Sequence, residues 1–597
     1  MIVPMSKVTL LVNRPDQDIA LKALRKMGLV HINIPRNLIS DTVTRLEEKL
    51  NRAEKALNII PFTDKPADAT SHSAQDVIDN VLDIEELRSN LHRRREELRE
   101  KMAWYDRWGT ISLEDVAALA KEALYIKLYT ASRSALETLQ DDQWIFVIGG
   151  DKNDVQLALI ATNNDQKLPF KEEILPDMEW HEIRDEEKEI EHDLSKLAGK
   201  LNTYTGDREK VKEKIVKIEK ELTLAKVRDS MAEEGPVVIL EGYIPEEEKD
   251  VIKKGADQNG WGYIIDKPAD EDQPPTLVKT AKWIETIKPV FEFMGTVPGY
   301  REYDISLWFL VFFSLFFAML IGDAGYGLIF ISLTAWARMK MKKAPAEPFR
   351  LMYVLGGATF FWGVISGTWF GSEQIATIPF LKQFIIAPVS SFDLNNPSEF
   401  NDNQNFMMAM CFVIGAVHLT IAHLINAWKL RNSLNTLGQI GWALIIWGVF
   451  FLAGQLVLNK PMPAAGGWLL GIGFLMALFF SAIEKGFVKG ALASLGNLPL
   501  NIISGFSDVV SYLRLFAVGY ASVVVAYSFN QMAVGDGISG FFSGLIAAMI
   551  LFLGHGLNIV LGAMSIIVHG VRLNMLEFSG HLGMEWSGIK YEPFKDN

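Results

Sequence analysis

An arginine lies inside a stretch of sequence that is apolar enough to cross a membrane. Arg514 is about eight residues into the segment SDVVSYLRLFAVGYASVVVAYSF. Insertion scales put an arginine at the centre of such a helix at roughly 2.5 to 3.5 kcal/mol unfavourable, so its charge must be compensated. Small residues at helical spacing around it would let a second helix come close; they are Ser507, Ser511, Ala517 and Ala521. The alternative is an arginine that snorkels to the headgroups or pairs with Asp508.

The last apolar stretch carries a second group of polar residues. They are spaced 3, 4, 3, 4 and 3 apart, which places them on one stripe of a helix: His555, Asn558, Gly562, Ser565, His569 and Arg572. Such a stripe must face protein or water rather than lipid, and its histidines and arginine could line a path for ions. The alternative is a hydrogen-bonded packing seam between helices.

Several kinds of chemistry are excluded by the motifs that the sequence lacks. There is no GxxxxGK[ST] phosphate-binding loop, no nucleophile elbow and no HExxH, so we expect no ATP hydrolysis by this chain and no catalytic residues. A single cysteine, Cys411, can form neither an internal disulfide nor a cysteine-based zinc site. We therefore expect no cofactor and no metal.

Charge divides the 597 residues into two halves that suit different solvents. Residues 1–300 hold 100 of the 131 charged residues, and residues 301–597 hold the other 31. The first half suits water and the second suits lipid. The first half has 14 more acidic than basic residues, which argues against nucleic acid as a partner. Its N-terminus lacks the pattern of a signal peptide, so we expect it to stay in the cytoplasm.

Eight apolar segments in the second half predict eight transmembrane helices. They lie at about 305–322, 324–341, 350–371, 404–428, 436–458, 464–484, 506–532 and 540–570. The loops on the predicted cytoplasmic side carry nine basic residues, namely Arg338, Lys340, Lys342, Lys343, Arg350, Lys429, Arg431, Lys485 and Lys489. The opposite loops carry only Lys382 and Lys460. This bias predicts an even number of spans with both termini in the cytoplasm.

The first half reads as an α/β domain with long helical arms. Strand-like runs such as KVTLLV and VVILEGYI alternate with charged helical stretches at about 40–59, 80–106 and 178–228. Within the third stretch, apolar residues repeat at intervals of three, four and seven, as in a coiled-coil seam: Ile183, Ile190, Leu194, Leu197 and Leu201, then Val211, Ile215, Ile218 and Leu222. A break near Gly206 favours antiparallel coiled-coil arms over a long parallel dimer, and locally these charge runs also suit solvated helix faces. We predict a cytoplasmic domain over 1–276, a linker over 277–304, a membrane domain over 305–580 and a cytoplasmic tail over 581–597.

Several motifs together resemble one known family, the membrane-embedded stator subunit of rotary V-type and A-type ATPases. This subunit is called subunit a in eukaryotes and subunit I in bacteria and archaea. The similarity spans the chain, and its most specific motifs are GDAGYG after the first apolar segment and SYLRLFAVGYAS in the seventh. The other matching motifs are MSKVTLLV, GLVHINI, EGYIP, QPPT, WGVISGTWFG, HGVRLNMLEF and GIKYEPF.

The resemblance implies a cytoplasmic half within the peripheral stalk and a membrane half that embraces a rotating ring. Arg514 would face the ion-carrying carboxylate of the ring, and Arg572 would be the second arginine of that region. Gly562 stands where eukaryotic members are expected to have a glutamate, so an acidic path residue does not carry over there. Glu577 is a candidate for the cytoplasmic mouth.

The function implied is translocation of protons or sodium ions through two half-channels against the ring, coupled to ATP hydrolysis or synthesis elsewhere in the complex. The expected partners are the rotor ring, peripheral-stalk subunits, through them the catalytic head, and the lipid bilayer. The short loops favour a prokaryotic cell membrane. The alternative functions are a self-sufficient secondary transporter with a cytoplasmic regulatory domain, and a scaffold that transports nothing. The sequence leaves open which ion moves and in which direction the machine runs.

Overall fold

The structure, a computed structural model, describes most of the chain in two compact units. The residues outside the description are 36–39, 64–65, 133–143, 151–153, 393–396, 482, 484–485, 536, 538–539 and 596–597. The predicted loop residue Lys485 is among them. One unit comprises residues 1–12, 22–32 and 241–597, and the other comprises residues 13–21 and 33–240. The predicted boundaries at 276, 304 and 580 stay predictions.

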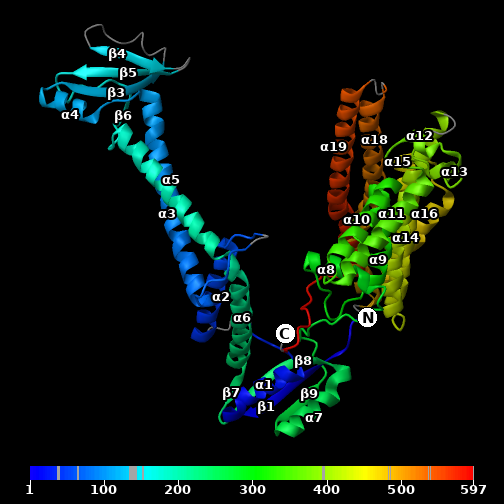
Figure 1. The fold of residues 1–597 in the computed structure, drawn as a ribbon. Coiled ribbons are helices and arrows are strands. Elements are labelled where there is room, and N and C mark those ends of the chain that lie inside the picture. Colours follow the sequence, from blue (N-terminus) through cyan, green and yellow to red (C-terminus); the bar gives the residue numbers. More distant parts are fainter. Residues whose placement is uncertain are drawn as a thin grey trace. The chain divides into compact units, whose positions relative to one another are not determined.

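The first soluble sheet has five strands. Its strands are β1 (Met5–Asn13), β2 (His31–Ile32), β7 (Ala232–Glu234), β8 (Val237–Pro245) and β9 (Gly262–Asp266). The order is β2-β8-β1-β9, with β7 also paired to β8. Lys7 lies opposite Asp266 and His31 opposite Tyr243 in antiparallel pairs. Helices α1 (Gln17–Met27) and α7 (Lys249–Asn259) accompany the sheet (Figure 1).

The predicted helical arms consist of four helices in two packed pairs. Helix α3 (Ala74–Trp108) packs with α5 (Trp180–Thr203), and α2 (Asp41–Ile59) packs with α6 (Arg208–Ser230). The two pairs are continuous in Figure 1 because α5 leads into α6 through a short 3-10 turn, Thr205–Asp207, at the predicted break. Eight of the nine predicted seam residues are buried; the exception, Leu194, is partly buried against the same core. Whether the supercoil is that of a true coiled coil stays a prediction.

A four-stranded antiparallel sheet joins the outer ends of α3 and α5. Its strands are β3 (Tyr125–Ser132), β4 (Ile145–Gly150), β5 (Asp154–Ala161) and β6 (Lys171–Glu173), in the order β4-β5-β3-β6. Helix α4 (Leu113–Lys121) precedes β3. Tyr129, Leu157 and Leu159 form the fully buried core on one face. The sheet therefore has a small hydrophobic core of its own.

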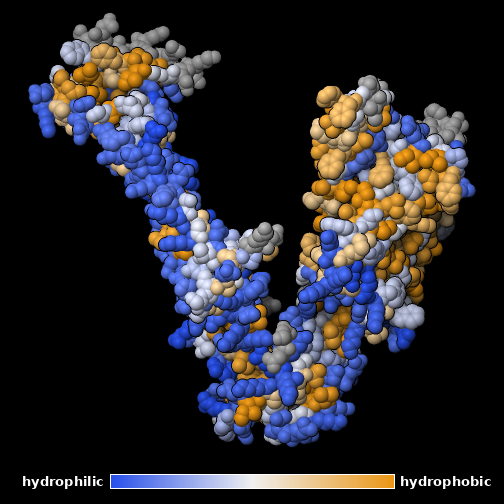
Figure 2. All heavy atoms as spheres, in the orientation of Figure 1, coloured by the Kyte–Doolittle hydropathy of each residue, from blue (hydrophilic) through white to orange (hydrophobic). Residues whose placement is uncertain are grey.

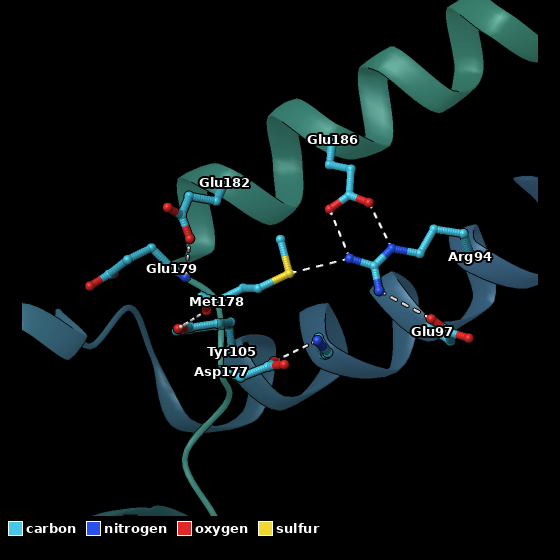
Figure 3. A network of polar contacts seen from close by, with 9 residues as sticks. Arg94, Glu97, Tyr105, Asp177, Met178, Glu179, Glu182 and Glu186 are labelled. Carbon is cyan, nitrogen blue, oxygen red and sulfur yellow. Dashed lines mark hydrogen bonds and ion pairs between the residues drawn. The ribbon is translucent and has the colours of Figure 1, made fainter.

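Arg94 on α3 and Glu186 on α5 clamp the outer helix pair (Figure 3). Arg94 Nε donates to Glu186 Oε1 at 2.6 Å, and Arg94 Nη2 donates to Glu186 Oε2 at 3.0 Å. Nearby, the Tyr105 hydroxyl donates to the carbonyl oxygen of Met178 at 2.8 Å. Such a fork-shaped pair fixes orientation better than a single charge contact does. These hydrogen bonds from Arg94 lower the pKa of the Glu186 carboxyl below its usual range.

We expect Glu186→Gln to loosen the outer helix pair at neutral pH by about 0.5 to 1 kcal/mol, as for other partly exposed pairs. The folded pKa of Glu186 is depressed, so its contribution is present above the unfolded value of about 4.3 and is lost as the pH falls through the folded pKa. Hydrogen exchange of α5 should be faster in the variant at pH 7, and the difference from wild type should disappear once the pH is below the folded pKa of Glu186. Glu189→Gln, an exposed change on the same helix, should have no effect at either pH.

In the described residues between 288 and 582, which form the membrane part, all of the regular elements are helices. Its long helices are α9 (Ser306–Ile321), α10 (Ala324–Lys340), α11 (Ala346–Ser366), α14 (Pro397–Lys429), α15 (Asn435–Leu458), α16 (Ala464–Phe480), α17 (Phe487–Ser511), α18 (Leu513–Val534) and α19 (Phe541–Ser565). Shorter helices include α8 (Lys288–Met294), α12 (Glu373–Ala376), α13 (Pro379–Lys382) and α20 (Ser579–Leu582). One large apolar core, which includes Phe309, Phe316 and Phe412, holds the helices together.

Each of the eight predicted apolar segments is helical, but fewer than eight satisfy the length and composition of a span. Within the described residues, five helical stretches are long and apolar enough to cross a membrane. A sixth is obtained if α9 and α10, which are bent by 119° at Gly322–Asp323, count as one. Helix α16 has only 17 residues, and α17 with α18 makes one stretch, Ser494–Val534. Several membrane-crossing helices are therefore present, and eight spans remain a prediction.

The C-terminal tail is bound along other parts of its own unit. The backbone N–H of Thr276 donates to the carbonyl of Ile589 at 2.7 Å, and the N–H of Tyr591 donates to the carbonyl of Thr276 at 3.1 Å. Further on, the N–H of Phe594 donates to the carbonyl of Val30 at 2.8 Å. The last residues of the chain thus connect the predicted linker with the first soluble sheet.

Candidate ion-path site

Arg514 lies at a helix junction rather than in the middle of one helix. Helix α17 ends at Ser511 and α18 begins at Leu513, with the fully buried Tyr512 between them. The Tyr512 hydroxyl lies 2.9 Å from His418 Nδ1, and the His418 ring is stacked between two phenylalanine rings. This packing fixes the junction. Arg514 Nε then donates to the freed carbonyl of Ser511 at 2.9 Å, which anchors the start of its side chain.

Glu577 brings two arginines and a serine together. Arg514 Nη2 donates to Glu577 Oε1 at 2.6 Å, and Ser511 Oγ donates to the same oxygen at 3.1 Å. Arg572 Nε lies 3.6 Å from it. The Glu577 side chain is 5% exposed, against 25% for Arg514 and 55% for Arg572. One buried carboxylate therefore compensates two arginines, which is how a charge becomes tolerable in the membrane part.

A change of helix type places Glu577 beside Arg572. Residues Ile566–Gly570 and Leu573–Phe578 form π-helix, in which backbone hydrogen bonds join residues five apart. Arg572 and Glu577 are five apart, so the wide turn brings them to one side, whereas an ordinary α-helix would separate them. Such turns are frequent at functional sites. A stripe drawn with 3.6 residues per turn therefore does not include Glu577.

His555 and Asn558 belong to a second polar cluster. The Tyr326 hydroxyl lies 2.7 Å from His555 Nδ1 and accepts from Asn558 Nδ2 at 3.1 Å. His555 Nε2 lies 3.1 Å from Asn530 Oδ1. Ser522 Oγ on α18 donates to Asn558 Oδ1 at 3.1 Å. The cluster connects α10, α18 and α19 through side chains that can both donate and accept hydrogen bonds.

Asp323 holds the start of α10, the helix that carries Tyr326 of this second cluster. It caps α10 by accepting from the backbone N–H groups of Gly325 at 2.8 Å and Tyr326 at 3.3 Å. It also accepts from the N–H groups of Phe370 and Gly371, both at 2.9 Å. Asp323 therefore fixes both the turn before α10 and the loop after α11.

The rest of the predicted stripe does not join either cluster. Ser565 Oγ donates back to the carbonyl of Leu561 at 2.8 Å, and a Cβ added at Gly562 would lie 2.6 Å from the side chain of Ile321. His569 is partly exposed, and its Nδ1 has no hydrogen-bond partner among the described residues. The structure thus divides the predicted site in two. Ser511, Arg514, Arg572 and Glu577 meet, whereas His555 and Asn558 belong to the other cluster.

Asp508 is not the partner of Arg514 that the sequence offered as an alternative. Asp508 Oδ2 instead lies 3.1 Å from His581 Nε2. Arg514 pairs with Glu577 instead. No sequence pattern indicated that His581, Tyr326 and Asn530 belong to these clusters. Each comes from a different segment, and none falls on a periodic stripe.

Helix α18 packs closely on α9 beside the site. A Cβ added at Gly519 would lie 2.3 Å from the carbonyl oxygen of Met319, so only glycine permits this approach. Among the described residues, no group of three or more histidine, cysteine, aspartate or glutamate side chains could hold a metal ion. The two clusters supply fixed positive charge, a carboxylate and hydrogen-bonding side chains.

These features define a polytopic membrane protein with a soluble α/β part and an arginine-centred polar site among its last helices. Residues 161–354 match the V-type ATPase 116kDa subunit family. The chain is 31% identical to the V-type ATP synthase subunit I of Borreliella burgdorferi over 100% of its own length and 99% of that relative. It is 30% identical to V-type ATP synthase subunit I 1 of Treponema pallidum, over the full length of both. The chain belongs to this family of V-type ATP synthase subunit I proteins.

A more distant relative agrees with this assignment. An A-type ATP synthase subunit I of Methanocaldococcus jannaschii is 27% identical over 70% of this chain and 66% of that relative. A crystal structure of the cytoplasmic N-terminal domain of a subunit I is 16% identical and covers 44% of this chain and 99% of its own length. Its TM-score is 0.21, which is too low to compare the two folds.

Proposed function

We propose that this chain is the stator subunit of a rotary V/A-type ATPase and forms the two ion half-channels against a rotating membrane ring. The observation that carries the proposal is Arg514, a charge in the membrane part, held by a buried glutamate beside a face that the chain itself leaves open. Ala517 and Ala521 of α18 are exposed on that face, as the predicted helix-packing surface requires. A ring helix that carries a carboxylate fits there by size and by charge.

The exposed apolar surface of α18 and α19 suits contact with a partner protein or with lipid (Figure 2). Helix α19 exposes a run of large apolar residues: Leu553, Leu557, Val560, Leu561 and Met564. Such side chains are stable against another apolar surface and unfavourable against water. In the proposed complex this surface faces the ring and the bilayer, and Arg514 stands at its edge.

The two polar clusters suit the two half-channels. An opposite charge within about 4 to 6 Å favours the ionised form of a carboxylate, so a ring carboxylate arriving at Arg514 releases its ion. The same fixed charge stops a bound ion from crossing directly. The Ser511–Glu577 side would serve one half-channel and the cluster of His555 and Asn558 the other, with His569 between them.

The remaining features complete the proposed topology. Eight spans with both termini in the cytoplasm of a prokaryotic cell would place residues 1–276 in the peripheral stalk, with coiled-coil arms reaching toward the catalytic head through other stalk subunits. ATP chemistry would take place in that head, and this chain would need no cofactor. Ion flow through the clusters would then be coupled to rotation.

Flux measurements in liposomes test this proposal against a self-sufficient transporter. The purified chain alone should move neither protons nor sodium ions when a gradient or a membrane potential is imposed. The complete complex, reconstituted at the same protein density, should pump ions when ATP is added. Ion flux through the isolated chain that saturates with solute concentration would favour the transporter instead.

A further inference from the structure

Four hydrogen-bonded side chains form a series beside the Arg514 site, on the side of the membrane part that is predicted to be cytoplasmic. His423 Nδ1 lies 2.8 Å from Gln439 Oε1, and His423 Nε2 lies 3.0 Å from His581 Nδ1. His581 Nε2 in turn lies 3.1 Å from Asp508 Oδ2. The four residues come from α15, α14, α20 and α17, and neither the stripe nor the Arg514–Glu577 group includes them.

The direction of each hydrogen bond in this series can be derived from its fixed end. An amide oxygen only accepts, so His423 Nδ1 must donate to Gln439 Oε1. In a neutral imidazole the other nitrogen then accepts, so His581 Nδ1 donates to His423 Nε2. His581 Nε2 and Asp508 Oδ2 are left facing each other as two acceptors. Their 3.1 Å contact needs one additional proton, which either the imidazole or the carboxylate can carry.

An open cavity of about 420 Å³ reaches this pair. Its lining includes His581 itself, Gln439 and Asn426, whose Nδ2 donates to the carbonyl of His581 at 3.0 Å. Exposed Lys429 and Arg301 and the partly exposed Glu302 provide the charged groups around the opening. Lys429 is one of the loop residues that predict the cytoplasmic side. The cavity is large enough to bring water to His581.

Asp508 leads from the cavity toward the arginine. It lies one helical turn before Ser511 on α17, and Ser511 Oγ contacts both the carbonyl of Asp508 at 2.8 Å and Glu577 Oε1 at 3.1 Å. His581 follows Glu577 by four residues, so one short segment carries both His581 and the partner of Arg514. The pair of His581 and Asp508 therefore lies between the cavity and the Arg514 site.

We propose that His581 and Asp508 form a proton relay at the cytoplasmic half-channel, so that the ion moved by this complex is the proton. A hydronium ion in the cavity gives its proton to His581 Nε2 and is left as water, so that His581 becomes an imidazolium beside the Asp508 carboxylate. The His581 Nε2–H bond then breaks as the Asp508 Oδ2–H bond forms, which turns an imidazolium into a neutral imidazole and a carboxylate into a carboxylic acid. Asp508 passes the proton on toward the ring carboxylate at Arg514. Sodium cannot use such a step, because the relay moves a proton between a nitrogen and an oxygen. The inference rests on the proposed stator function.

His581→Gln tests the relay in the complete complex, reconstituted in liposomes and driven by ATP. Glutamine keeps a hydrogen-bonding side chain but cannot carry a proton, so we expect proton pumping to fall by roughly 100-fold, the lower end of what a positioned acid–base group contributes. His192→Gln, on the exposed surface of α5, serves as the matched control and should pump normally. Asp508→Asn should resemble His581→Gln.

Imidazole rescue separates a relay from a structural contact. In His581→Ala, added imidazole can enter the space beside the cavity and should restore a measurable fraction of proton pumping, while His192→Ala should not respond to it. Normal pumping by an assembled His581→Gln complex, or ATP-driven uptake of radioactive sodium in place of protons, would overturn the relay. Failure of the stator proposal has a different signature, since Arg514→Ala would then also pump normally.

Discussion

A complex that contains Arg514→Ala should assemble and should fail to pump ions when ATP is supplied. Arg514 is the charge that the structure holds at the open face of α18, and Arg572 does not take its place, because it is 55% exposed and lies 3.6 Å from the shared carboxylate. Loss of one preorganised charge at a reacting centre commonly costs 100-fold or more in rate. We expect ATP-driven ion uptake to fall by at least about that factor.

The variant is compared with two others in the same vesicle assay. Arg350→Ala removes an exposed arginine from the start of α11, where it makes a loose 3.8 Å contact with Glu347, and should leave pumping intact. Arg514→Lys keeps the charge but loses the planar fork, so an intermediate rate is expected. ATP-driven pumping at the wild-type rate by the Arg514→Ala complex would refute the role given to this residue.

Asp323→Ala should destabilise the membrane part more than any other single change considered for this chain. Its buried carboxylate accepts four backbone N–H groups, two at the start of α10 and two in the loop after α11. Alanine leaves these buried donors without a partner, and each such group costs about 1 to 3 kcal/mol. We expect a loss of about 3 to 5 kcal/mol after partial relaxation, measured by unfolding of the purified protein in detergent and SDS mixtures.

Asparagine at position 323 should retain part of this stability, because its amide oxygen still accepts hydrogen bonds while its NH₂ group faces the remaining donors. Glu347→Ala, in the first turn of α11, is a suitable control and should shift unfolding by less than about 0.5 kcal/mol. Equal stability of Asp323→Ala and wild type would mean that the four hydrogen bonds contribute nothing net.

Much of the fold could be predicted from the sequence because its signals are local. The division into a watery and an apolar half follows from charge, and the seam of α5 and α6 follows from the spacing of Ile183 to Leu222. The number of spans was harder to predict, because hydropathy cannot distinguish a 119° bend between α9 and α10 from a complete hairpin. Likewise, no periodicity indicates that Tyr512 divides one apolar stretch into two helices.

The candidate site could be predicted only in part. Arg514 and Arg572 are conspicuous as charges in apolar sequence, but their common partner Glu577 lies on a π-helical turn that a period of 3.6 residues does not describe. His581 and Asp508 meet because α20 and α17 both pack on α14, which is a tertiary arrangement without a sequence signal. The family resemblance supplied a role for Arg514, and packing determined which residues surround it.

The bound C-terminal tail has a consequence for how the chain is made. The segment that pairs with Thr276 and Val30 comes after all of the apolar helices in the sequence, so the early strands must wait for it until those helices have been synthesised. Domains generally fold as units and early segments first; here one edge of the soluble part is completed only after the apolar helices have been made.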